Sequence, residues 1–477
     1  MSAIPREILS LNPEEIDFDD KKAVRNLILK LLNVIETQAK IIDELRQENQ
    51  RLKDEINCLK GEKGKPEIKP SVPRKENNIP QEKRSRKWRK RSKKQRIKID
   101  KTEIRRLDPG TLPPDAKHKG YRSVVVQDII FETNNTEYKL ERYYSKREGR
   151  LYEAELPPDV DGEFGHGIKA FVVYLYFACR VPEKKIWKML NENGAVISQG
   201  QISNILTKTN REEFTLEKDN ILKAGMSCTN YFHIDDTGAR HNGMNHYVHA
   251  ICTTLFTAFF ILPRKDRDAI KDILGLSKDE QIEKIMISDD AKQFWSVAIL
   301  HALCWIHEIR HYRKLNPFLE WHRIKLHDFL TEIWKFYEQL KEYKENPDDR
   351  QKEFLERRFE ELFSTRTGYE ELDKRIALTK EKKDRLLLVL EYPKIPLHNN
   401  PVEIALRELV IKKKISYGTR SEYGRIAWEN MMSLLDTCRK HDVSFFDYVK
   451  DIFSGEYSMP RLSTLILEKA MINPTSY

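Results

Sequence analysis

Two pairs of aspartates, each placed directly after a short apolar run, constrain the fold of this 477-residue chain more than any other feature. The run YFHI leads into Asp235 and Asp236, and the run KIMIS leads into Asp289 and Asp290. Between them lie two further strand-like runs, YVHAICTTL and TAFFILP, and a helix-like segment at 267–283. The pattern predicts three strands, a helix and a fourth strand, with carboxylates at the ends of two strands.

This order is the layout of an RNase H-like α/β fold. Carboxylates brought together at strand ends can hold two divalent metal ions about 3.5–4 Å apart. Mg²⁺ suits such a site because it keeps several waters and takes one or two carboxylates plus phosphate oxygens. An aspartate pair after a strand is also a common turn and helix-cap signal, so each pair alone has a purely structural alternative. Two pairs in the expected places favour the metal interpretation.

A third acid is predicted in the string LHNNPVEIALRELVIKKK. Asn400 has the position of an N-cap, Pro401 that of the first helical residue, and Glu403 follows three residues after the cap. The structural alternative is a capping box, in which Glu403 only returns to the helix backbone. However, Glu403 shares one helical face with Arg407 and Lys414, and an acid beside cations suits a site for metal and phosphate.

At these residues the sequence resembles the insertion-sequence 66 family of DDE transposases. The matching stretches are HIDDTGAR, MISDDAKQF, CWIHEIRHYRKL and PLHNNPVEIALRELVIKKKISYGT, of which the last is the most specific. The resemblance covers roughly residues 230–455 and extends more faintly to the N-terminal part. It implies an RNase H-like catalytic core at 226–314 and 395–455, with Asp235, Asp289 and Glu403 as the catalytic and metal-binding triad. Two Mg²⁺ (or Mn²⁺) ions are the implied cofactors.

The resemblance implies a DNA transposase that cleaves at transposon ends and transfers the 3′-hydroxyl into target DNA. Phosphates would be held by Arg407, Lys412, Lys413 and Lys414. Cys304 and His307 match a Cys-x-x-His signature of several such families, and we expect them to be structural near the site. Three alternatives stay open: an RNase H-like nuclease without strand transfer, a dimeric DNA-binding regulator whose acids are only caps, and a degenerate, inactive copy.

Two departures from the family pattern affect this interpretation. The family usually has Glu after the first aspartate of the triad, whereas this chain has Asp236, which leaves open which acid binds metal. Family members also often carry a Cys-rich zinc-binding module, but no cysteine lies between Cys58 and Cys179. Recognition of the DNA ends would then depend on a basic arm and a helix-turn-helix.

The basic arm is the segment at 83–106, which holds 14 basic and 2 acidic residues, against 85 and 75 in the whole chain. This segment therefore carries the whole positive excess. Such density repels itself and predicts a disordered linker over 61–107 that binds a polyanion. The predicted phosphate contacts, whose strength falls with salt, are Arg84, Arg86, Arg89, Lys90, Arg91, Lys93 and Lys94. A solubilising linker is the alternative.

Residues 22–60 show a heptad repeat. Its a positions are Ile28, Ile35, Ile42, Asn49 and Ile56, and its d positions are Leu31, Gln38, Leu45, Leu52 and Leu59. Ile at a with Leu at d favours two parallel strands, and a single Asn at a fixes the register. We expect a homodimer through this coiled coil. One long helix lying on its own domain is the alternative.

Two small regions precede the core. A β module is predicted at 108–155, where TNNT separates the apolar runs SVVVQDIIF and YKLERYY as in a hairpin. A helix-turn-helix-like region is predicted at 165–212, with Gln199 and Gln201 placed to reach DNA bases from the second helix. A pair of helices at this spacing is equally well a packing unit.

Residues 315–394 are charged and strongly helical, and we expect them to be a helical insertion in the core. The insertion either shields the transposon end and contacts flanking DNA, or is a solvated hairpin with only a spacing role. Residues 456–477 are expected to form a C-terminal tail.

The sequence also predicts the compartment. The best apolar run, at 250–262, is too short for the ~20 residues of a membrane span. The N-terminus lacks a secretory signal, and six scattered cysteines indicate a reducing compartment. We expect a cytoplasmic, nucleoid-associated protein of a prokaryote, with double-stranded DNA (transposon ends and target) as partner and no membrane. The resemblance also implies small companion proteins encoded by the same element.

Overall fold

The computed structural model describes residue 8 and residues 16–59, 99–108, 113, 120–157, 160 and 162–472. They belong to two compact units, one of Met1–Gln47 and Asn134–Tyr477 and one of Glu48–Thr133. Among the described helices, none is both long and apolar enough to cross a membrane. The predicted DNA contacts of the basic arm, from Arg84 to Lys94, all lie outside the described residues.

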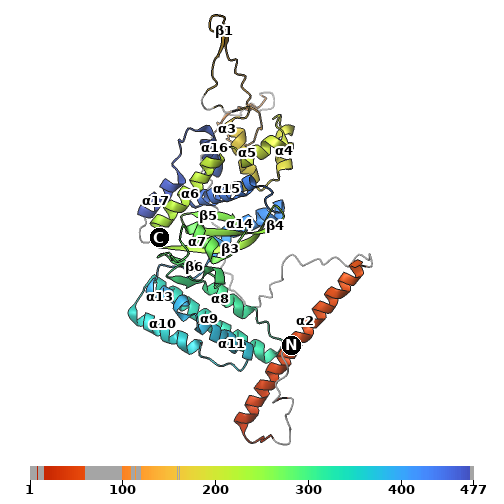
Figure 1. Cartoon of the computed structure of the whole chain (residues 1–477), viewed down its shortest axis with the longest axis vertical. Helices are drawn as coiled ribbons and strands as arrows, with labels where there is room; N and C mark the ends of the chain where they lie inside the picture. The colour runs from red at the N-terminus through yellow and green to blue at the C-terminus, as the bar shows by residue number, and fades with distance from the viewer. Residues whose placement is uncertain are drawn as a thin grey trace. The chain divides into compact units, whose positions relative to one another are not determined.

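Five strands form one mixed sheet in the order β5-β4-β3-β6-β7 (Figure 1). The strands are β3 (Tyr231–His241), β4 (Met244–Cys252), β5 (Thr257–Leu262), β6 (Ile285–Ser288) and β7 (His301–Leu303). The first three form an antiparallel meander, and β6 and β7 run parallel to β3. The predicted meander, helix α7 (Arg267–Leu274) and strand β6 are confirmed, in the arrangement expected of an RNase H-like core.

The two faces of the sheet bury different cores. Successive side chains of a strand point to opposite faces, so Met286 of β6 joins one core while Ile285 and Ile287 join the other. The first core is shared with α14 (Asn400–Ser416) and α15 (Glu422–Lys440), which pack on β3 and β5.

Further helices also contribute to the first core. They are α3 (His166–Val173), α4 (Glu183–Glu192), α5 (Gln199–Thr207), α6 (Arg211–Cys228), α16 (Phe445–Ser454) and α17 (Leu462–Ile472). The last of these corrects the expected tail at 456–477. Leu462 and Ile466 are fully buried, and α17 packs against α6, so residues 462–472 belong to the folded domain.

The insertion at 315–394 is helical, as predicted. It contains α9 (Glu320–Glu345), α10 (Asp349–Leu362), α11 (Glu370–Lys380), α12 (Lys383–Leu386) and α13 (Leu388–Glu391), and it packs on α8 (Trp305–Arg313). Phe336 and Phe359 of the insertion are buried in contact with Trp305 of α8. The insertion is therefore not a solvated hairpin, because its apolar side chains form a second core together with the sheet and α8. Its role, in shielding DNA or in spacing, stays a prediction.

The hairpin predicted in the β module at 108–155 is present at a later position than expected. The structure pairs β1 (Arg142–Ser145) with β2 (Arg150–Glu153), and the turn lies at 146–149 instead of at TNNT. Gly149 has a φ of 60°, a left-handed conformation that glycine adopts without strain and that suits this turn. The apolar run SVVVQDIIF forms no strand in the described residues. Residues with high β propensity form a strand only where a second strand pairs with them, and this run has no such partner among the described residues.

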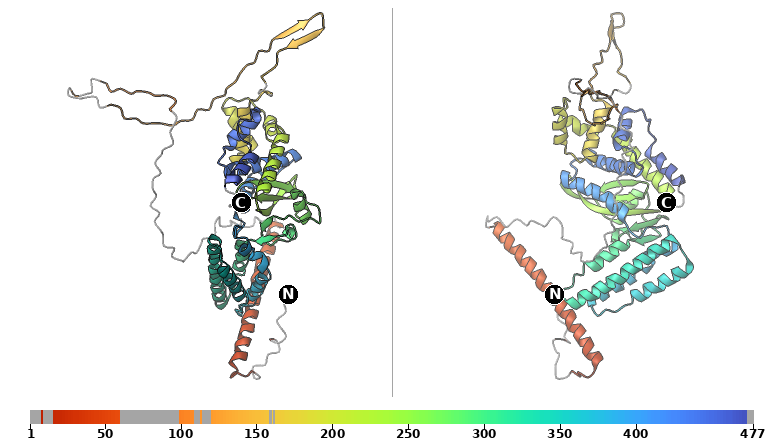
Figure 2. Two further views of the ribbon diagram at one scale, coloured as in Figure 1. Left: turned by 90° about the vertical axis from the view of Figure 1, so that its left-hand side faces the viewer. Right: turned by 180° about the vertical axis from the view of Figure 1, so that it is seen from behind.

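The heptad segment is a single helix, α2 (Lys21–Leu59). Views from two sides place it beside α9 and α11 of the insertion (Figure 2), and its side chains bond to both regions. Ile28, Ile35 and Ile42 nevertheless remain about half exposed. The alternative of a helix lying on its own domain is thus correct for one face, while the coiled coil stays a prediction for the other.

Candidate active site

Three predicted acids converge at one end of the central strands. Parallel pairing of His233 on β3 with Ile287 on β6 places Asp235 and Asp289, each two residues further on, at the same end of adjacent strands. Glu403 lies in the first turn of α14, which packs on β3. Asp289, Asp236 and Glu403 all act electrostatically on Asp235. The structure therefore brings the predicted triad together.

The second aspartate of each pair is neutralised by a cation. Asp236 lies 2.7 Å from the Nζ of Lys265, and Asp290 lies 2.8 Å from both Lys382 and Arg385. Among the described residues, neither Asp235 nor Asp289 forms an ion pair. Asp235 and Asp289 are thus the two aspartates that a described cation does not neutralise.

The pKa of Asp235 is raised to about 7, mainly by burial and also by the nearby carboxylates of Asp289, Asp236 and Glu403. A hydrogen bond from the backbone N–H of Asp236 lowers it in part. This environment is unfavourable for an isolated negative charge and favourable for a bound cation. Three carboxylates offer only hard oxygen ligands, which is the donor set that Mg²⁺ and Mn²⁺ prefer. The residues present fit the implied metal.

The surroundings of Glu403 argue against the capping box. The N-cap of α14 is Asn399, one residue earlier than predicted. The Glu403 carboxylate accepts from the Nη2 of Arg310 at 3.1 Å and lies 3.6 Å from the Nδ1 of His307. These partners come from α8, so Glu403 faces across the site and does not return to the start of its own helix.

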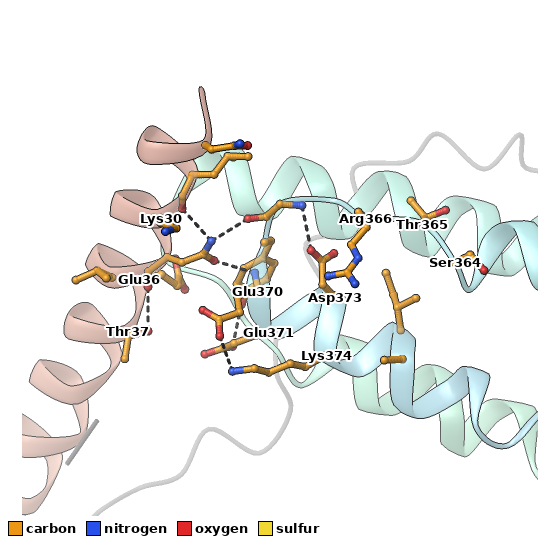
Figure 3. A pocket seen from close by; sticks show the side chains of 18 of the residues that line it. Lys30, Glu36, Thr37, Ser364, Thr365, Arg366, Glu370, Glu371, Asp373 and Lys374 are labelled. Atoms are coloured by element: carbon orange, nitrogen blue, oxygen red, sulfur yellow. Dashed lines mark hydrogen bonds and ion pairs between the residues drawn. The ribbon is translucent and has the colours of Figure 1, made fainter. Parts of the chain in front are cut away.

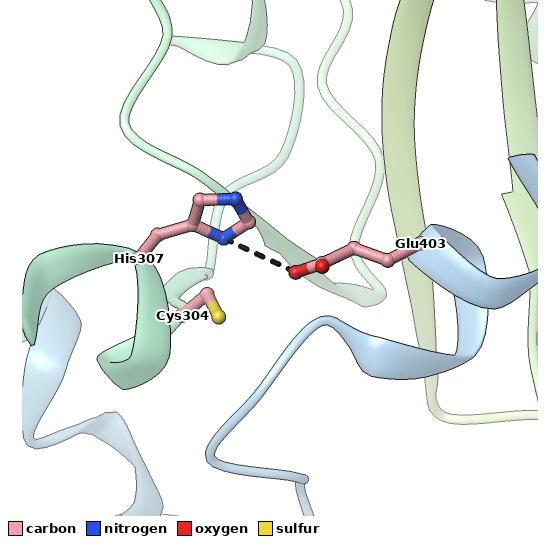
Figure 4. A group of neighbouring side chains, drawn as sticks. All are labelled: Cys304, His307 and Glu403. Atoms are coloured by element: carbon pink, nitrogen blue, oxygen red, sulfur yellow. Dashed lines mark ion pairs between the residues drawn. The ribbon is translucent and has the colours of Figure 1, made fainter. Parts of the chain in front are cut away.

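Cys304 and His307 lie beside Glu403 (Figure 4), with their ligand atoms and a Glu403 oxygen within 4.8 Å of one another. The buried Sγ of Cys304 accepts from the backbone N–H of Asn399 at 3.2 Å, and burial raises the pKa of this thiol to about 11. The guanidinium of Arg310 already bonds to both His307 and Glu403. Zinc binds a thiolate, whereas the Cys304 thiol is protonated, and the Arg310 cation already occupies the space beside His307 and Glu403. Cys304 and His307 therefore agree better with structural roles than with a zinc site.

Sequence reasoning missed Asn399. Its side chain is fully buried, donating to the carbonyl of Ile234 at 3.0 Å and accepting from the Nδ1 of His233 at 2.9 Å. Its backbone N–H bonds to Cys304. Asn399 thereby ties β3, which carries Asp235, to the start of the helix that carries Glu403. The doubled asparagine in HNNP was the available signal, but local capping rules assigned it to Asn400.

Replacing Asn399 by alanine is expected to destabilise the protein by about 1–3 kcal/mol, because two buried groups lose their hydrogen-bond partner. Displacement of Glu403 relative to Asp235 is expected to slow any metal-dependent reaction of the site by about 10²-fold. Asn400→Ala is the matched control, since Asn400 is exposed, and should change stability by less than about 0.5 kcal/mol. Equal effects of the two substitutions in urea unfolding and in turnover would contradict this role.

The predicted phosphate contacts on α14 divide into two groups. Arg407 and Lys414 are exposed, and Lys413 donates to the carbonyl of Gly238 at 2.5 Å. Lys412 is only 1 % exposed, donates to the carbonyl of Tyr176 at 2.8 Å, and has its pKa lowered to about 7 by burial. The prediction of a phosphate contact is therefore wrong for Lys412, which falls on the buried face of the helix.

The helix-turn-helix-like region forms α4 and α5, and α5 begins at Gln199 with Ser198 as its N-cap. Ile202 and Ile205 of α5 are buried in the first core, so the pair does serve as a packing unit. Gln199 is exposed and Gln201 partly exposed at the start of the helix. Both side chains therefore stay accessible for the DNA contacts predicted for them.

The raised pKa of Asp235 predicts a pH-dependent stability in the absence of metal. Unfolded Asp titrates near about 4, so between that pH and about 7 the folded protein binds more protons than the unfolded one, and stability falls as pH rises. Asp235→Asn should thus be more stable than wild type at pH 8, on the order of a few kcal/mol, with no gain near pH 4. Urea unfolding at both values, in EDTA, measures this; a gain independent of pH would contradict it.

Comparison with known proteins indicates the family of the chain. The family described as transposase IS66 matches residues 161–426, more than half of the chain. The protein y4jO of Sinorhizobium fredii (strain NBRC 101917 / NGR234) is 40% identical over 190 residues, which cover 39% of this chain. The matched region spans 58% of the length of that relative.

Proposed function

The chain belongs to the transposase IS66 family, and from this premise we propose that it is a DDE-type DNA transposase that uses Asp235, Asp289 and Glu403 as its catalytic triad. The observation that carries the proposal is the selective neutralisation of the site. Lys265, Lys382 and Arg385 pair with the second aspartate of each doublet, and Asp235 and Asp289 are left for a cation.

Asp235 and Asp289 would hold the first of two Mg²⁺ (or Mn²⁺) ions, and Glu403 would complete the shell of the second. Such ions, when bound, activate a water or 3′-hydroxyl and stabilise the leaving oxygen of an in-line displacement. Arg310 holds the Glu403 carboxylate from α8, and Asn399 sets the start of its helix against β3. These residues orient the carboxylates before DNA binds.

Hydrolysis at the transposon end would release a 3′-hydroxyl, which then attacks target DNA in the same site. Arg407 and Lys414 are exposed on the helix of Glu403 and would hold phosphates, assisted by Lys413. The basic arm would add sequence-independent affinity, and Gln199 and Gln201 would contact bases. Pairing two ends requires two active sites, which the predicted coiled-coil homodimer supplies. We place the protein on DNA in the cytoplasm, with small companion proteins of the same element as further partners.

The test is incubation of the purified chain with a labelled duplex that carries the ends of its encoding element, in Mg²⁺, in Mn²⁺ and in EDTA. We expect metal-dependent cleavage at the ends and, with a target plasmid, joined products. Cleavage without joined products would indicate a nuclease of the same fold. Binding that is equal in EDTA, with no cleavage in either metal even with the companion proteins added, would indicate a DNA-binding regulator.

A further inference from the structure

Helix α2 is fastened to the insertion by a buried carboxylate. Glu36 is 1 % exposed, and its two oxygens accept from the backbone N–H groups of Phe318 at 2.7 Å and of Leu319 at 2.9 Å. These groups lie at the start of α9, where Leu319 is the N-cap and provides no side-chain acceptor. The Nδ1 of His322, which is fully buried, donates to the same carboxylate at 3.2 Å. Glu36 therefore binds the chain directly at the N-terminal end of α9, where it satisfies the N–H of the N-cap residue Leu319.

Figure 3 shows Glu36 and Thr37 of α2 beside Glu370 and Glu371 at the start of α11. Two further polar side chains of α2, Asn33 and Lys40, contact the segment that leads into α11. Asn33 donates to the carbonyl of Gly368 and accepts from the N–H of Glu370, at 2.9 and 2.8 Å. Lys40 bonds to the carbonyl of Leu315 at 3.2 Å and pairs with Glu371. A groove of about 1390 Å³ follows this junction. Most of these contacts join side chains of α2 to backbone groups of the insertion, which holds α2 at a defined position. We call the contacting parts of the insertion, at 315–322 and 368–371, the seat of α2.

Leu29 adds close apolar packing to this seat. Gly368 has a φ of +83°, and a Cβ at this position would lie 3.0 Å from the Cδ2 of Leu29 and 3.1 Å from Trp321. Glycine is therefore required here both by the backbone conformation and by the close approach of α2.

The hydrogen bonds and close packing described above use outer positions of the heptad, and the d-position Gln38 lines the groove beside them. Leu29 and Glu36 occupy b positions, and Asn33 and Lys40 occupy f positions, on the face opposite to the a and d stripe. The stripe itself stays open, with Ile28, Ile35, Ile42 and Leu45 between 48% and 60% exposed. Seating α2 on the insertion therefore leaves its apolar seam free for another helix.

The charges beside the seam indicate which helix that is. Glu48 occupies a g position, and Lys53 occupies the e position of the next heptad. In a parallel, in-register pair of α2 helices, Glu48 of each copy would face Lys53 of the other, and the Asn49 side chains would meet at the seam. The seam is thus complementary to a second copy of itself.

The insertion is also tied to the catalytic core. Lys382 pairs with Asp290 at 2.8 Å and with the buried Glu308 at 3.2 Å, and Arg385 pairs with Asp290 at 2.8 Å. Asp290 directly follows Asp289. Ion pairs and packed helices therefore connect the seat of α2 with the end of β6.

We propose that the helical insertion is the seat of the dimerisation helix: each chain holds its own α2 by the b and f face, while the a and d face binds α2 of a second copy. The insertion thereby places each catalytic core at a fixed position on the dimer. This inference deepens the proposed function, on which it rests for the purpose of pairing two DNA ends.

The test measures mass and amide exchange, which need neither DNA nor metal, so its failure is distinguishable from failure of the transposase proposal. Ile35→Asp with Ile42→Asp should convert the dimer to a monomer in light scattering, with protection unchanged at 315–325 and 366–372. Glu36→Ala with Asn33→Ala should keep the dimer mass and lose that protection. Glu36→Gln should lose less, because an acceptor oxygen remains. Gln47→Asp, at an exposed outer position, should change neither quantity.

Each contrary result overturns a defined part of the proposal. A dimer that survives the two isoleucine substitutions would show that the second copy binds elsewhere. A monomer that also loses protection at 315–325 would show that α2 sits on the partner's insertion. Unchanged protection in the Glu36 and Asn33 variant would show that α2 does not occupy this seat.

Discussion

Replacement of Asp235, Asp289 or Glu403 by alanine is expected to abolish metal-dependent cleavage, with a loss of at least about 10³-fold, because each carboxylate would contribute several kcal/mol by holding metal at the reacting phosphate. The reason lies in the charges of the site. No described cation is paired with Asp235 or Asp289, whereas lysine and arginine neutralise their neighbours. On the proposed assignment, removal of either free carboxylate would remove a metal ligand.

The measurement is the initial rate of cleavage of a labelled end duplex, with DNA binding recorded in parallel. Binding should be retained, because the basic arm and α5 are untouched. Asp236→Asn is the matched control, since it alters an acid one residue away that already pairs with Lys265, and should cost less than about tenfold. If Asp235→Ala cleaved at the wild-type rate while Asp236→Asn did not cleave, Asp236 and not Asp235 would be the metal ligand.

The second large effect concerns Glu308, whose replacement by alanine is expected to destabilise the protein by about 3–5 kcal/mol, the typical cost of breaking a buried ion pair. Glu308 is 4 % exposed and accepts from Thr379 at 2.6 Å and from Arg375 and Lys382. Its removal leaves the Arg375 and Lys382 cations without their buried partner. Unfolding in urea, followed by circular dichroism, measures the change.

Glu360→Ala provides the control for this prediction. Glu360 pairs with Lys383 at 2.8 Å and Lys380 at 3.3 Å in the same insertion, but its side chain is 43% exposed. An exposed pair of this kind contributes less than about 1 kcal/mol. Similar losses in the two variants would mean that the Glu308 network does not join α8 to α11 in solution.

Several features of this protein follow from local pattern alone. Alternation along YFHIDD and the apolar run in KIMIS predicted β3 and β6, because strand periodicity is a property of neighbouring residues. The heptad predicted α2 for the same reason. Carboxylates at the ends of both strands predicted that Asp235 and Asp289 would meet, which parallel pairing of the strands brings about.

Short sequence patterns did not predict the structure correctly where two local conformations have similar energy and a distant residue decides between them. The choice between Asn399 and Asn400 as N-cap is one case, since the buried partners of Asn399 lie 166 residues earlier, at His233. The burial of Lys412 is another, because it depends on Tyr176, which precedes it by 236 residues. The hairpin turn was also misplaced, since its register depends on which runs find a facing strand.

The spacing of neighbouring side chains was thus sufficient to predict strands β3 to β6 with helix α7, the three acids of the site and the apolar stripe of α2. Only the tertiary structure decided which aspartate of each pair is free, since Lys382 and Arg385 reach Asp290 from the far end of the insertion. It also decided which face of α2 is seated. Ion pairs and burial depend on distances between residues remote in sequence, and folding alone sets those distances.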